Sequence, residues 1–202
     1  MNGFEEKLCG YIGKDNLNKI QEVTIGIAGA GGLGSNCAFN LVRSGFNKLI
    51  IVDFDHIEAS NLNRQFYFYD QLGKPKVEAL EKNLKRINPD INITAIHTKL
   101  EKENIKDIFK TCDIVVEAFD KAEYKALIIQ ELIKEKEFIV AASGLAGWGN
   151  SDEIKTHYIR QNLVIIGDLK TEVGEDTPPI SPKVNIAAAK QADAILEYVL
   201  GR

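Results

Sequence analysis

Closely spaced glycines follow an apolar run near the start of the chain. Gly29, Gly31 and Gly34 form a G-x-G-x-x-G pattern after the run 23–28, and Gly32 removes one further side chain. Glycines let the backbone approach an anion closely, and the unpaired N–H groups at a helix N-terminus bind phosphate. The pattern therefore predicts a strand, a phosphate-binding turn and a helix; the alternative is a tight turn without a ligand.

An acidic residue stands where a dinucleotide-binding fold places one. Asp53 closes the second apolar run, Lys48–Asp53, about 20 residues after the last glycine of the pattern. A carboxylate at this place accepts hydrogen bonds from ribose hydroxyls. The alternative is a strand-end aspartate that caps the next turn.

The segment 60–65, SNLNRQ, is dense in planar hydrogen-bonding side chains. Asn61, Asn63, Arg64 and Gln65 stand almost side by side, with no apolar periodicity. The guanidinium of Arg64 offers a rigid fork of donors that suits phosphate oxygens. We therefore predict that this segment contributes to a binding site.

Lys76 falls in the first turn of a predicted helix that begins at Pro75. The apolar residues Val77, Leu80 and Leu84 give this helix one buried face. A lysine at this position either meets a phosphate or is simply solvated, and the residues alone leave both interpretations open.

Asp120 follows the predicted buried strand 113–119. Ligands of open parallel sheets bind outside the carboxyl ends of the strands, so Asp120 is placed to hold a magnesium ion on a nucleotide. The alternative is a helix N-cap for the segment that follows.

Apolar segments of strand type and of helix type alternate along the chain. They predict an α/β fold, a Rossmann-like three-layer sandwich with a mostly parallel central sheet, helices on both faces and a C-terminal antiparallel extension. The segment 168–181 is polar, contains proline and is predicted to be a mobile crossover. The predicted strands are 23–28, Lys48–Asp53, 91–98, 113–119, Phe138–Ala142, 156–160 and Leu163–Gly167; the predicted helices are 35–44, 75–87, 101–110, 121–136 and 184–200.

Size and composition limit the class of protein. The chain has 202 residues, of which 45% are hydrophobic, so we predict one domain over 1–202 with 1–22 as an N-terminal leader. Within this leader, Leu8, Tyr11 and Ile12 are spaced as on a short amphipathic helix. The net charge of −4 argues against nucleic-acid binding as the main activity, and no apolar run approaches membrane length. We expect a cytoplasmic protein.

The cysteines indicate a reducing compartment. There are three, Cys9, Cys37 and Cys112, and they are scattered along the chain. None stands in a C-x-x-C pair, so no zinc site is predicted.

Taken together, these motifs resemble the ThiF/MoeB/ubiquitin-activating superfamily in order and approximate spacing. The resemblance rests on GAGGLGS, the D-x-D pair Asp53 and Asp55, SNLNRQ, GKPK ending at Lys76, and Asp120 after a buried strand. The short length looks most like the ThiF proteins, which adenylylate the sulfur carrier protein ThiS in thiamine biosynthesis.

The resemblance implies a reaction and a set of ligands. The C-terminal glycine carboxylate of a ubiquitin-like carrier ending in Gly-Gly attacks the α-phosphate of Mg-ATP, which gives an acyl-adenylate and pyrophosphate. No general base is needed, because a carboxylate is already ionised near pH 7. A homodimer is also implied, which would cover the aromatic run 66–69 and part of the leader. The resemblance implies that Arg64, Lys76 and Asp120 take part in catalysis and that Asp120 binds magnesium. The implied nucleotide ligands are Gly29, Gly31, Gly32, Gly34, Asp53, Asp55, Asn61, Asn63, Arg64, Gln65 and Lys76.

The chain departs from the family pattern in three ways. It lacks the two C-x-x-C pairs of full-length relatives. The segment 168–184 contains no cysteine, so we predict adenylation without a thioester on this segment. Relatives often supply an N-terminal arginine to the partner subunit, whereas the first arginine here is Arg43, inside a predicted helix.

Three other functions are compatible with part of the pattern. A nicotinamide-dependent dehydrogenase fits the glycine turn and the acidic residue, but it gives no account of SNLNRQ or Lys76. An enzyme of the same superfamily could activate a carboxylate on a tRNA base or a peptide. A non-catalytic ThiF-like partner in a heterodimer is disfavoured by the presence of Arg64, Lys76 and Asp120.

Overall fold

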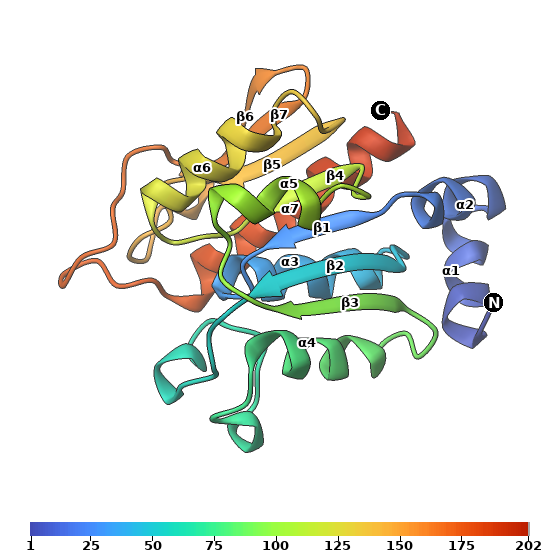
Figure 1. The fold of residues 1–202 in the computed structure, drawn as a ribbon, viewed down its shortest axis with the longest axis horizontal. Helices are drawn as coiled ribbons and strands as arrows, with labels where there is room; N and C mark the ends of the chain where they lie inside the picture. The colour runs from blue at the N-terminus through green and yellow to red at the C-terminus, as the bar shows by residue number, and fades with distance from the viewer. Residues whose placement is uncertain (202) are drawn as a thin grey trace.

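The computed structural model describes residues 1–201 and confirms the predicted α/β fold. One seven-stranded sheet has the order β3-β2-β1-β4-β5-β7-β6 (Figure 1). The pairs are parallel except β6 with β7, which forms the predicted antiparallel extension. The strands are β1 (Ile25–Ala28), β2 (Lys48–Asp53), β3 (Asn92–His97), β4 (Ile114–Glu117), β5 (Phe138–Ala142), β6 (Lys155–Arg160) and β7 (Leu163–Gly167).

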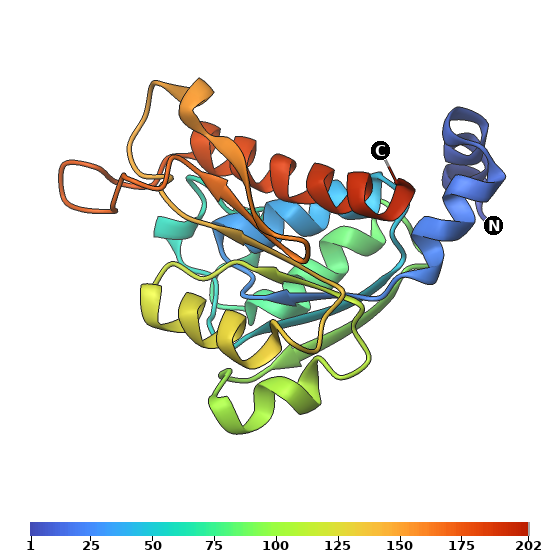
Figure 2. The same ribbon diagram turned by 90° about the horizontal axis from the view of Figure 1, so that it is seen from above.

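Helices cover both faces of the sheet. α3, α4 and α7 pack on one face, and α5 and α6 pack on the other (Figure 2). α1 and α2 lie beyond the end of the sheet at which the parallel strands begin (Figure 1). The helices are α1 (Gly3–Ile12), α2 (Lys14–Glu22), α3 (Gly32–Arg43), α4 (Lys76–Lys85), α5 (Lys102–Ile108), α6 (Ala122–Leu132) and α7 (Ser181–Leu200), with short 3-10 turns η1 (Ala59–Asn61), η2 (Tyr69–Gln71) and η3 (Ser151–Glu153).

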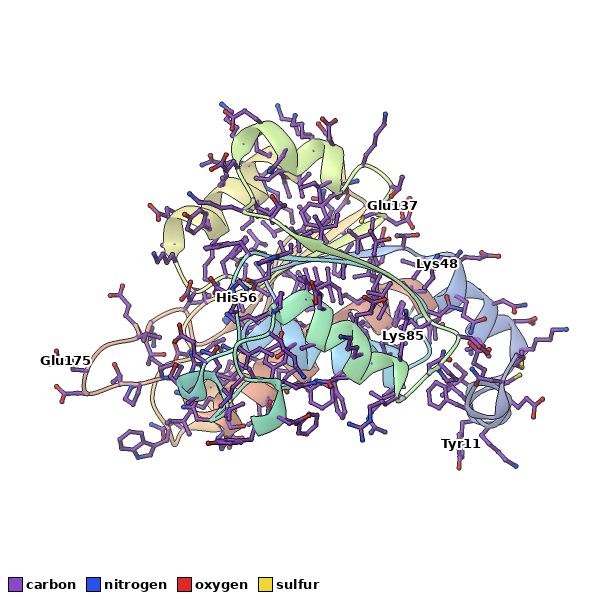
Figure 3. The ribbon with its side chains drawn as sticks, turned by 60° about the horizontal axis from the view of Figure 1, so that its bottom comes forward. Tyr11, Lys48, His56, Lys85, Glu137 and Glu175 are labelled. Carbon is purple, nitrogen blue, oxygen red and sulfur yellow. The ribbon has the colours of Figure 1, made fainter. Side chains whose placement is uncertain are left out.

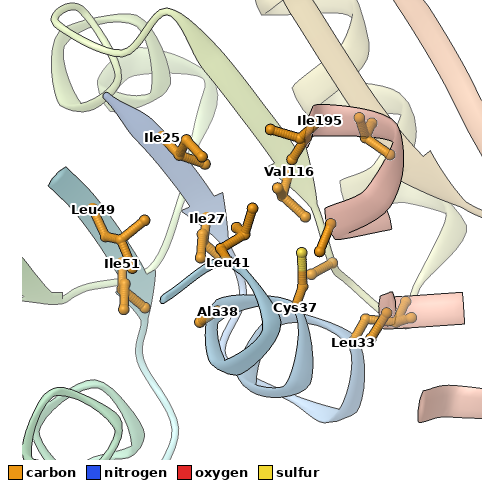
Figure 4. Packing of buried hydrophobic residues seen from close by; sticks show 14 of the residues in the cluster. Ile25, Ile27, Leu33, Cys37, Ala38, Leu41, Leu49, Ile51, Val116 and Ile195 are labelled. Carbon is orange, nitrogen blue, oxygen red and sulfur yellow. The ribbon is translucent and has the colours of Figure 1, made fainter. Parts of the chain in front are cut away.

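The core lies between the centre of the sheet and the helices α3 and α7. Ile25 and Ile27 of β1 pack against Cys37 and Leu41 of α3 and against Ile195 of α7 (Figure 4). All five side chains are fully buried. Burying an aliphatic side chain of this size stabilises the fold by about 1.5–3 kcal/mol, so this contact fixes α3 and α7 relative to the central strands.

The glycine turn differs from its prediction at its second half. Helix α3 begins at Gly32 rather than near Ser35, so Gly32 and Gly34 are helical residues and the turn is shorter than expected. A Cβ at Gly34 would overlap the carbonyl oxygen of Gly29. Helix α3 starts early because glycine at position 34 lets the first turn of the helix pack directly on the residues that follow β1.

The N-terminal leader also differs from its prediction. It forms two helices, which Gly13 separates with a φ of 83°. The predicted short helix that carries Leu8, Tyr11 and Ile12 is present as α1, and Tyr11 is 87% exposed on it. The leader is instead anchored by Leu17 and Ile20 of α2, which are fully buried.

The carboxyl ends of the parallel strands lie together at one end of the molecule (Figure 1). The loops that follow β1, β2, β4 and β5 all leave the sheet there, and so does the segment 168–180, called the strap below. None of the helices in residues 1–201 is long and apolar enough to cross a membrane. The predicted site residues therefore lie on the strand ends, loops and helix starts along one edge of the sheet.

We predict that Gly26→Ala destabilises the protein. Gly26 lies in β1 beneath the buried ring of Phe109, and a Cβ there would lie 2.5 Å from Phe109 Cδ1. Overpacking of this kind costs about 1–3 kcal/mol, to be measured as the free energy of unfolding in urea.

A matched substitution controls for the change of glycine to alanine. Gly10 lies in α1, and a Cβ added to it would meet no atom within 4 Å, so Gly10→Ala is expected to stabilise by about 0.5–1 kcal/mol. Equal effects of the two substitutions would contradict the packing argument.

Candidate functional site

The N-terminus of α3 presents free backbone donors at the end of β1. Gly29 has a φ of 101°, and Gly31 is the N-cap residue of α3. No side chain within residues 1–201 caps this end of the helix. The first N–H groups of a helix have no partner inside the helix and carry the positive end of its dipole. This turn is therefore suited to an anion.

Asp53 holds the glycine turn against the end of β2. Its Oδ2 accepts a hydrogen bond from the N–H of Ala30 (2.6 Å), and its Oδ1 accepts one from the N–H of Asp55 (2.8 Å). Each carboxylate oxygen has a second acceptor position, so these bonds leave room for a ribose hydroxyl. The structure thus assigns Asp53 a turn-fixing role, and its contact with ribose stays a prediction.

Lys76 is held beside the same turn by an ion pair. Its Nζ lies 2.7 Å from Asp55 Oδ2, and its N–H donates to the Asp55 carbonyl (2.9 Å). The Lys76 side chain is almost fully buried, whereas that of Asp55 is half exposed. Lys76 is therefore not the solvated lysine of the alternative interpretation.

Tyr67 completes this side of the turn. Its hydroxyl donates to the carbonyl of Ala30 (2.7 Å). Burial raises the pKa of Tyr67 well above its ordinary value, and the charges of Asp53 and Asp55 raise it further. The phenol is therefore neutral at physiological pH and acts as a fixed donor.

The SNLNRQ segment crosses over the first turn of α3. The aliphatic part of Arg64 lies above Gly32, where a Cβ would be 3.5 Å from Arg64 Cγ. Asn36 Nδ2 donates to the Arg64 carbonyl (2.8 Å), and the hydroxyl of Ser35 accepts from the N–H of Phe66 (3.0 Å). These bonds bring Arg64 to the free donors of the helix.

Gln65 has an unsatisfied polar atom at the turn. Its side chain is 9% exposed, and its carboxamide oxygen has no hydrogen-bond partner within residues 1–201. Its Nε2 would lie 3.9 Å from a Cβ placed on Gly31. Because a buried polar atom without a partner costs free energy, this carboxamide is suited to a bound ligand.

The two asparagines of the segment mainly support their neighbours. Asn61 Oδ1 accepts a hydrogen bond from the N–H of Glu58 (3.0 Å) and so closes its own loop. Asn63 Oδ1 accepts from Arg64 Nη1 (2.7 Å), and Asn63 Nδ2 donates to the carbonyl of Pro179 (3.2 Å). Asn63 therefore connects Arg64 to the strap, and direct contact of either asparagine with a nucleotide stays a prediction.

Asp120 lies apart from these hydrogen-bonded groups. It is exposed, two residues before α6, and the N-cap residue is Lys121, with no side-chain cap bond in the part of the chain described. The N-cap alternative is therefore wrong. No cluster of three or more potential metal ligands occurs in residues 1–201, and a role of Asp120 on magnesium stays a prediction.

A buried ion pair that was not predicted from the sequence lies at the end of β4. Glu117 is fully buried and lies 3.2 Å from Lys125 Nζ of α6. Lys125 also donates to the carbonyl of Ala142 (2.9 Å), and the N–H of Phe119 donates to Glu117 Oε1 (2.7 Å). Burial raises the pKa of Glu117, although the charge of Lys125 and these hydrogen bonds oppose the rise. The signal in the sequence was an acidic residue within an apolar strand.

Comparisons of this chain with a family model and with known proteins agree on one family. The ThiF family model matches residues 6–201. Over 133 residues the chain is 35% identical to the sulfur carrier protein ThiS adenylyltransferase of Bacillus subtilis, covering 64% of this chain and 40% of that protein. Over 137 residues it is 31% identical to the tRNA threonylcarbamoyladenosine dehydratase of the same organism, covering 67% of this chain and 54% of that protein. The chain thus spans about half, or less, of the length of these relatives.

The fold agrees with a solved structure. The E. coli tRNA N6-threonylcarbamoyladenosine dehydratase TcdA in complex with ATP matches with a TM-score of 0.88. The match covers 96% of this chain and 93% of that chain at 18% sequence identity. At this identity the likeness establishes the fold.

We predict that Lys125→Met destabilises the protein in a pH-dependent way. Removing the lysine leaves the carboxylate of Glu117 buried without its partner, which costs about 3–5 kcal/mol at neutral pH. The pKa of Glu117 is already raised, so its protonation on acidification removes the unpaired charge from the folded state. The loss in free energy of unfolding caused by Lys125→Met should therefore shrink as the pH falls from about 7 towards 5. Urea unfolding of both proteins at the two pH values measures it.

Two variants check this interpretation. The double variant E117Q/K125M should recover part of the lost stability, because no charge is then buried alone. Lys106→Met removes a surface lysine paired with Glu135 and should change little. A loss in Lys125→Met that is independent of pH would contradict the role of the Glu117 charge.

Proposed function

This chain belongs to the ThiF family, and from that membership we propose that it is an ATP-dependent adenylyltransferase that activates a carboxylate. As the specific substrate we propose the C-terminal glycine of a ubiquitin-like sulfur carrier protein of ThiS type, as in thiamine biosynthesis. The 35% identity to a ThiS adenylyltransferase supports this choice.

One observation carries the proposal of ATP binding. An uncapped helix N-terminus, the aliphatic stem of Arg64 and the carboxamide of Gln65 meet at Gly31 and Gly32, and the Arg64 guanidinium is held nearby by the Ser60 carbonyl (3.0 Å) and Asn63 Oδ1 (2.7 Å). Backbone N–H groups at a helix N-terminus and arginine side chains bind phosphate. The unsatisfied carboxamide oxygen of Gln65 is an acceptor, so it is suited to a hydroxyl or amino group of the nucleotide. Asp53 at the end of the neighbouring strand is then placed for the ribose.

The proposed reaction is a displacement at the α-phosphorus. A carboxylate oxygen of the carrier forms a bond to this phosphorus, and the bond from the phosphorus to the oxygen that bridges to the β-phosphate breaks. The products are the acyl-adenylate and pyrophosphate, and no proton is transferred. Two anions must meet, so the protein contributes by positioning and by offsetting charge, with Arg64 and Lys76 as the cationic groups.

Magnesium would enter this site with the nucleotide. The ion commonly uses one or two protein carboxylates together with phosphate oxygens, and the exposed carboxylate of Asp120 fits this need. When bound, it supplies further neutralisation of the phosphate charge.

The positions of the cysteines support adenylation without a thioester on the segment 168–184, which contains none. Burial raises the pKa of Cys112 to about 12, and it raises that of fully buried Cys37 further. Cys9 lies on α1, at the opposite end of the sheet from the glycine turn (Figure 1). A thiol that is buried and protonated is a poor nucleophile.

A second candidate substrate is a tRNA base. The 31% identity to a tRNA threonylcarbamoyladenosine dehydratase favours it. The strap beside the site opposes it, because Glu172, Glu175 and Asp176 are exposed there, and Glu175 lies at the outer tip (Figure 3). Phosphate backbones are bound through lysine and arginine, so an acidic strap favours a protein carrier over a nucleic acid.

We predict that Arg64→Ala slows adenylation on the order of a hundredfold or more, because it removes charged donors from the phosphate site. The measurement is ATP–pyrophosphate exchange with magnesium and a ThiS-type carrier ending in Gly-Gly. Wild-type exchange should require the last glycine of the carrier. Arg43→Ala, which removes an exposed arginine at the far end of α3, is the control and should retain full exchange.

Other outcomes identify other functions. Full exchange by Arg64→Ala would contradict its role. Nucleotide binding without exchange on the carrier, together with ATP consumption on tRNA, would favour the second candidate.

We also propose a homodimer that covers the loop of η2. Phe68 and Tyr69 are 43% and 79% exposed, and Phe68 continues a row of aromatic rings that includes Phe66 and Phe39. Tyr69→Arg should shift the protein towards monomer in sedimentation velocity. Tyr158→Arg, on the edge strand β6, should not; a monomeric wild type would overturn the proposal.

A further inference from the structure

Ala30 lies between the last residue of the sheet ladder and the first residue of the helical ladder. The N–H of Gly29 still donates to the carbonyl of Val52 on β2 (2.9 Å). The carbonyl of Gly31 already accepts from the N–H of Ser35 on α3 (3.0 Å). Ala30 is fully buried, so its own peptide groups need partners, and within residues 1–201 these partners are side chains.

Two side chains hold the peptide groups on either side of Ala30. The N–H of Ala30 donates to Asp53 Oδ2 (2.6 Å), and the carbonyl of Ala30 accepts a hydrogen bond from the hydroxyl of Tyr67 (2.7 Å). Tyr67 is 5% exposed, and its raised pKa keeps the hydroxyl protonated at physiological pH. Because a buried carbonyl without a partner costs free energy, the Ala30 carbonyl stays directed at the phenol.

The Ala30 carbonyl shares its peptide plane with the N–H of Gly31. Every peptide bond in residues 1–201 is trans, and the C=O and N–H of a trans peptide point in opposite directions. The hydrogen bond from Tyr67 therefore sets the direction of the Gly31 N–H. Ala30 and Tyr67 are buried, whereas Gly31 is partly exposed, so this N–H points away from the interior.

The Gly31 N–H is the first of a row of donors at the glycine turn. It has no hydrogen-bond partner within residues 1–201. The N–H groups that follow it belong to the first turn of α3, which has no partners for them inside the helix. The aliphatic stem of Arg64 lies over the next residue, Gly32. The bond from Tyr67 thus aims a backbone donor at the place where the other proposed phosphate ligands gather.

The backbone that carries Tyr67 is itself fixed to α3. The hydroxyl of buried Ser35 accepts a hydrogen bond from the N–H of Phe66 (3.0 Å) and donates to the carbonyl of Gly31 (2.7 Å). The N–H of Tyr67 donates to the carbonyl of Gln65 (2.8 Å). The phenol is therefore held on a short, bonded segment and cannot follow the Ala30 carbonyl if that peptide rotates.

From this geometry we propose that Tyr67 is a positioning residue for the phosphates of ATP, because its hydroxyl holds the Ala30 carbonyl inward and so turns the Gly31 N–H towards them. The inference rests on the proposed function, since it assigns the ligand of that N–H. The Tyr67 hydroxyl itself is buried and bonded to the protein, so its effect on the ligand passes through the peptide. A nucleoside without phosphates does not use the Gly31 N–H and is indifferent to the hydroxyl.

The test compares the binding of ATP and of adenosine to Tyr67→Phe. This variant keeps the buried ring and removes only the hydroxyl, so the peptide between Ala30 and Gly31 is free to rotate. We expect Tyr67→Phe to bind ATP about tenfold more weakly than wild type, because one hydrogen bond to a charged group is lost. Its affinity for adenosine should stay unchanged. Calorimetry in the presence of magnesium measures ATP, and competition against ATP measures adenosine.

Two further variants separate positioning from folding. Tyr158→Phe removes a phenol hydroxyl that donates to Glu197 Oε2 (2.9 Å) on the edge strand β6, and it should bind both ligands as wild type does. Ser35→Ala releases the segment that carries Tyr67 and should weaken ATP binding by a smaller factor, with adenosine unchanged. If Tyr67→Phe does not fold, Ser35→Ala decides the question by the same comparison.

Two results would overturn the positioning role. One is an ATP affinity of Tyr67→Phe equal to that of wild type. The other is a parallel loss of ATP and adenosine affinity, because that loss indicates a general loosening of the site and no selective effect on the phosphates.

The outcome is separable from that of the proposed function. ATP–pyrophosphate exchange by wild type tests the reaction, and the affinities of Tyr67→Phe for ATP and adenosine test the positioning role. ATP binding without exchange would refute the adenylyltransferase and still allow the comparison. Full exchange with unchanged affinities in Tyr67→Phe would refute the positioning role alone, and a wild type that binds no ATP would refute both.

Discussion

The close approach of α3 to the end of β1 is the contact on which the rest of the site depends. Gly34 rests against the carbonyl of Gly29, with no space for a side chain between them. This approach sets the helix N-terminus directly at the carboxyl edge of the sheet. Asp53 then fixes the intervening turn through the N–H of Ala30, because a carboxylate bound to backbone donors resists displacement of the turn. Without this contact the free donors of α3 would not meet the loops that follow the neighbouring strands.

Helix α7 extends this arrangement to the far half of the sheet. It packs on α3 through the core at Ile195 and Cys37, and its first turn meets the glycine turn at Val184. In the middle of the helix, Gln191 donates to the carbonyl of Glu117 (3.1 Å) at the end of β4. One helix therefore contacts both the glycine turn and the end of β4, so it fixes these two parts of the carboxyl edge relative to each other.

The sequence could predict the parts of this site that depend on local pattern. Apolar runs located the buried strands, and the motif from Ser60 to Gln65 located the loop over α3, because both signals are confined to a few neighbouring residues. The early start of α3 could not be predicted, since glycine has low helix propensity and only the packing of Gly34 reveals why the helix begins there. The pair of Glu117 and Lys125 could not be predicted either, because its meaning depends on which residue of α6 faces the strand end.

Three lysines with acidic partners surround the site, and their placement opposes a general electrostatic preference. Lys76, Lys125 and Lys183 all lie near the start of a helix, in α4, α6 and α7. A cation there is disfavoured by the positive end of the helix dipole, and Lys76 and Lys183 carry the further cost of burial. Each is retained beside a carboxylate, of Asp55, Glu117 or Asp168. In the pairs of Lys76 and Lys183 the lysine is almost fully buried, whereas in the pair of Lys125 the carboxylate is the buried member. A lysine paired with a carboxylate carries little net charge, so these pairs hold ammonium donors in place without creating a strong positive potential. For the proposed reaction, in which a carboxylate must approach a triphosphate, the positive end of α3 and the guanidinium of Arg64 are the groups that offset the negative charge.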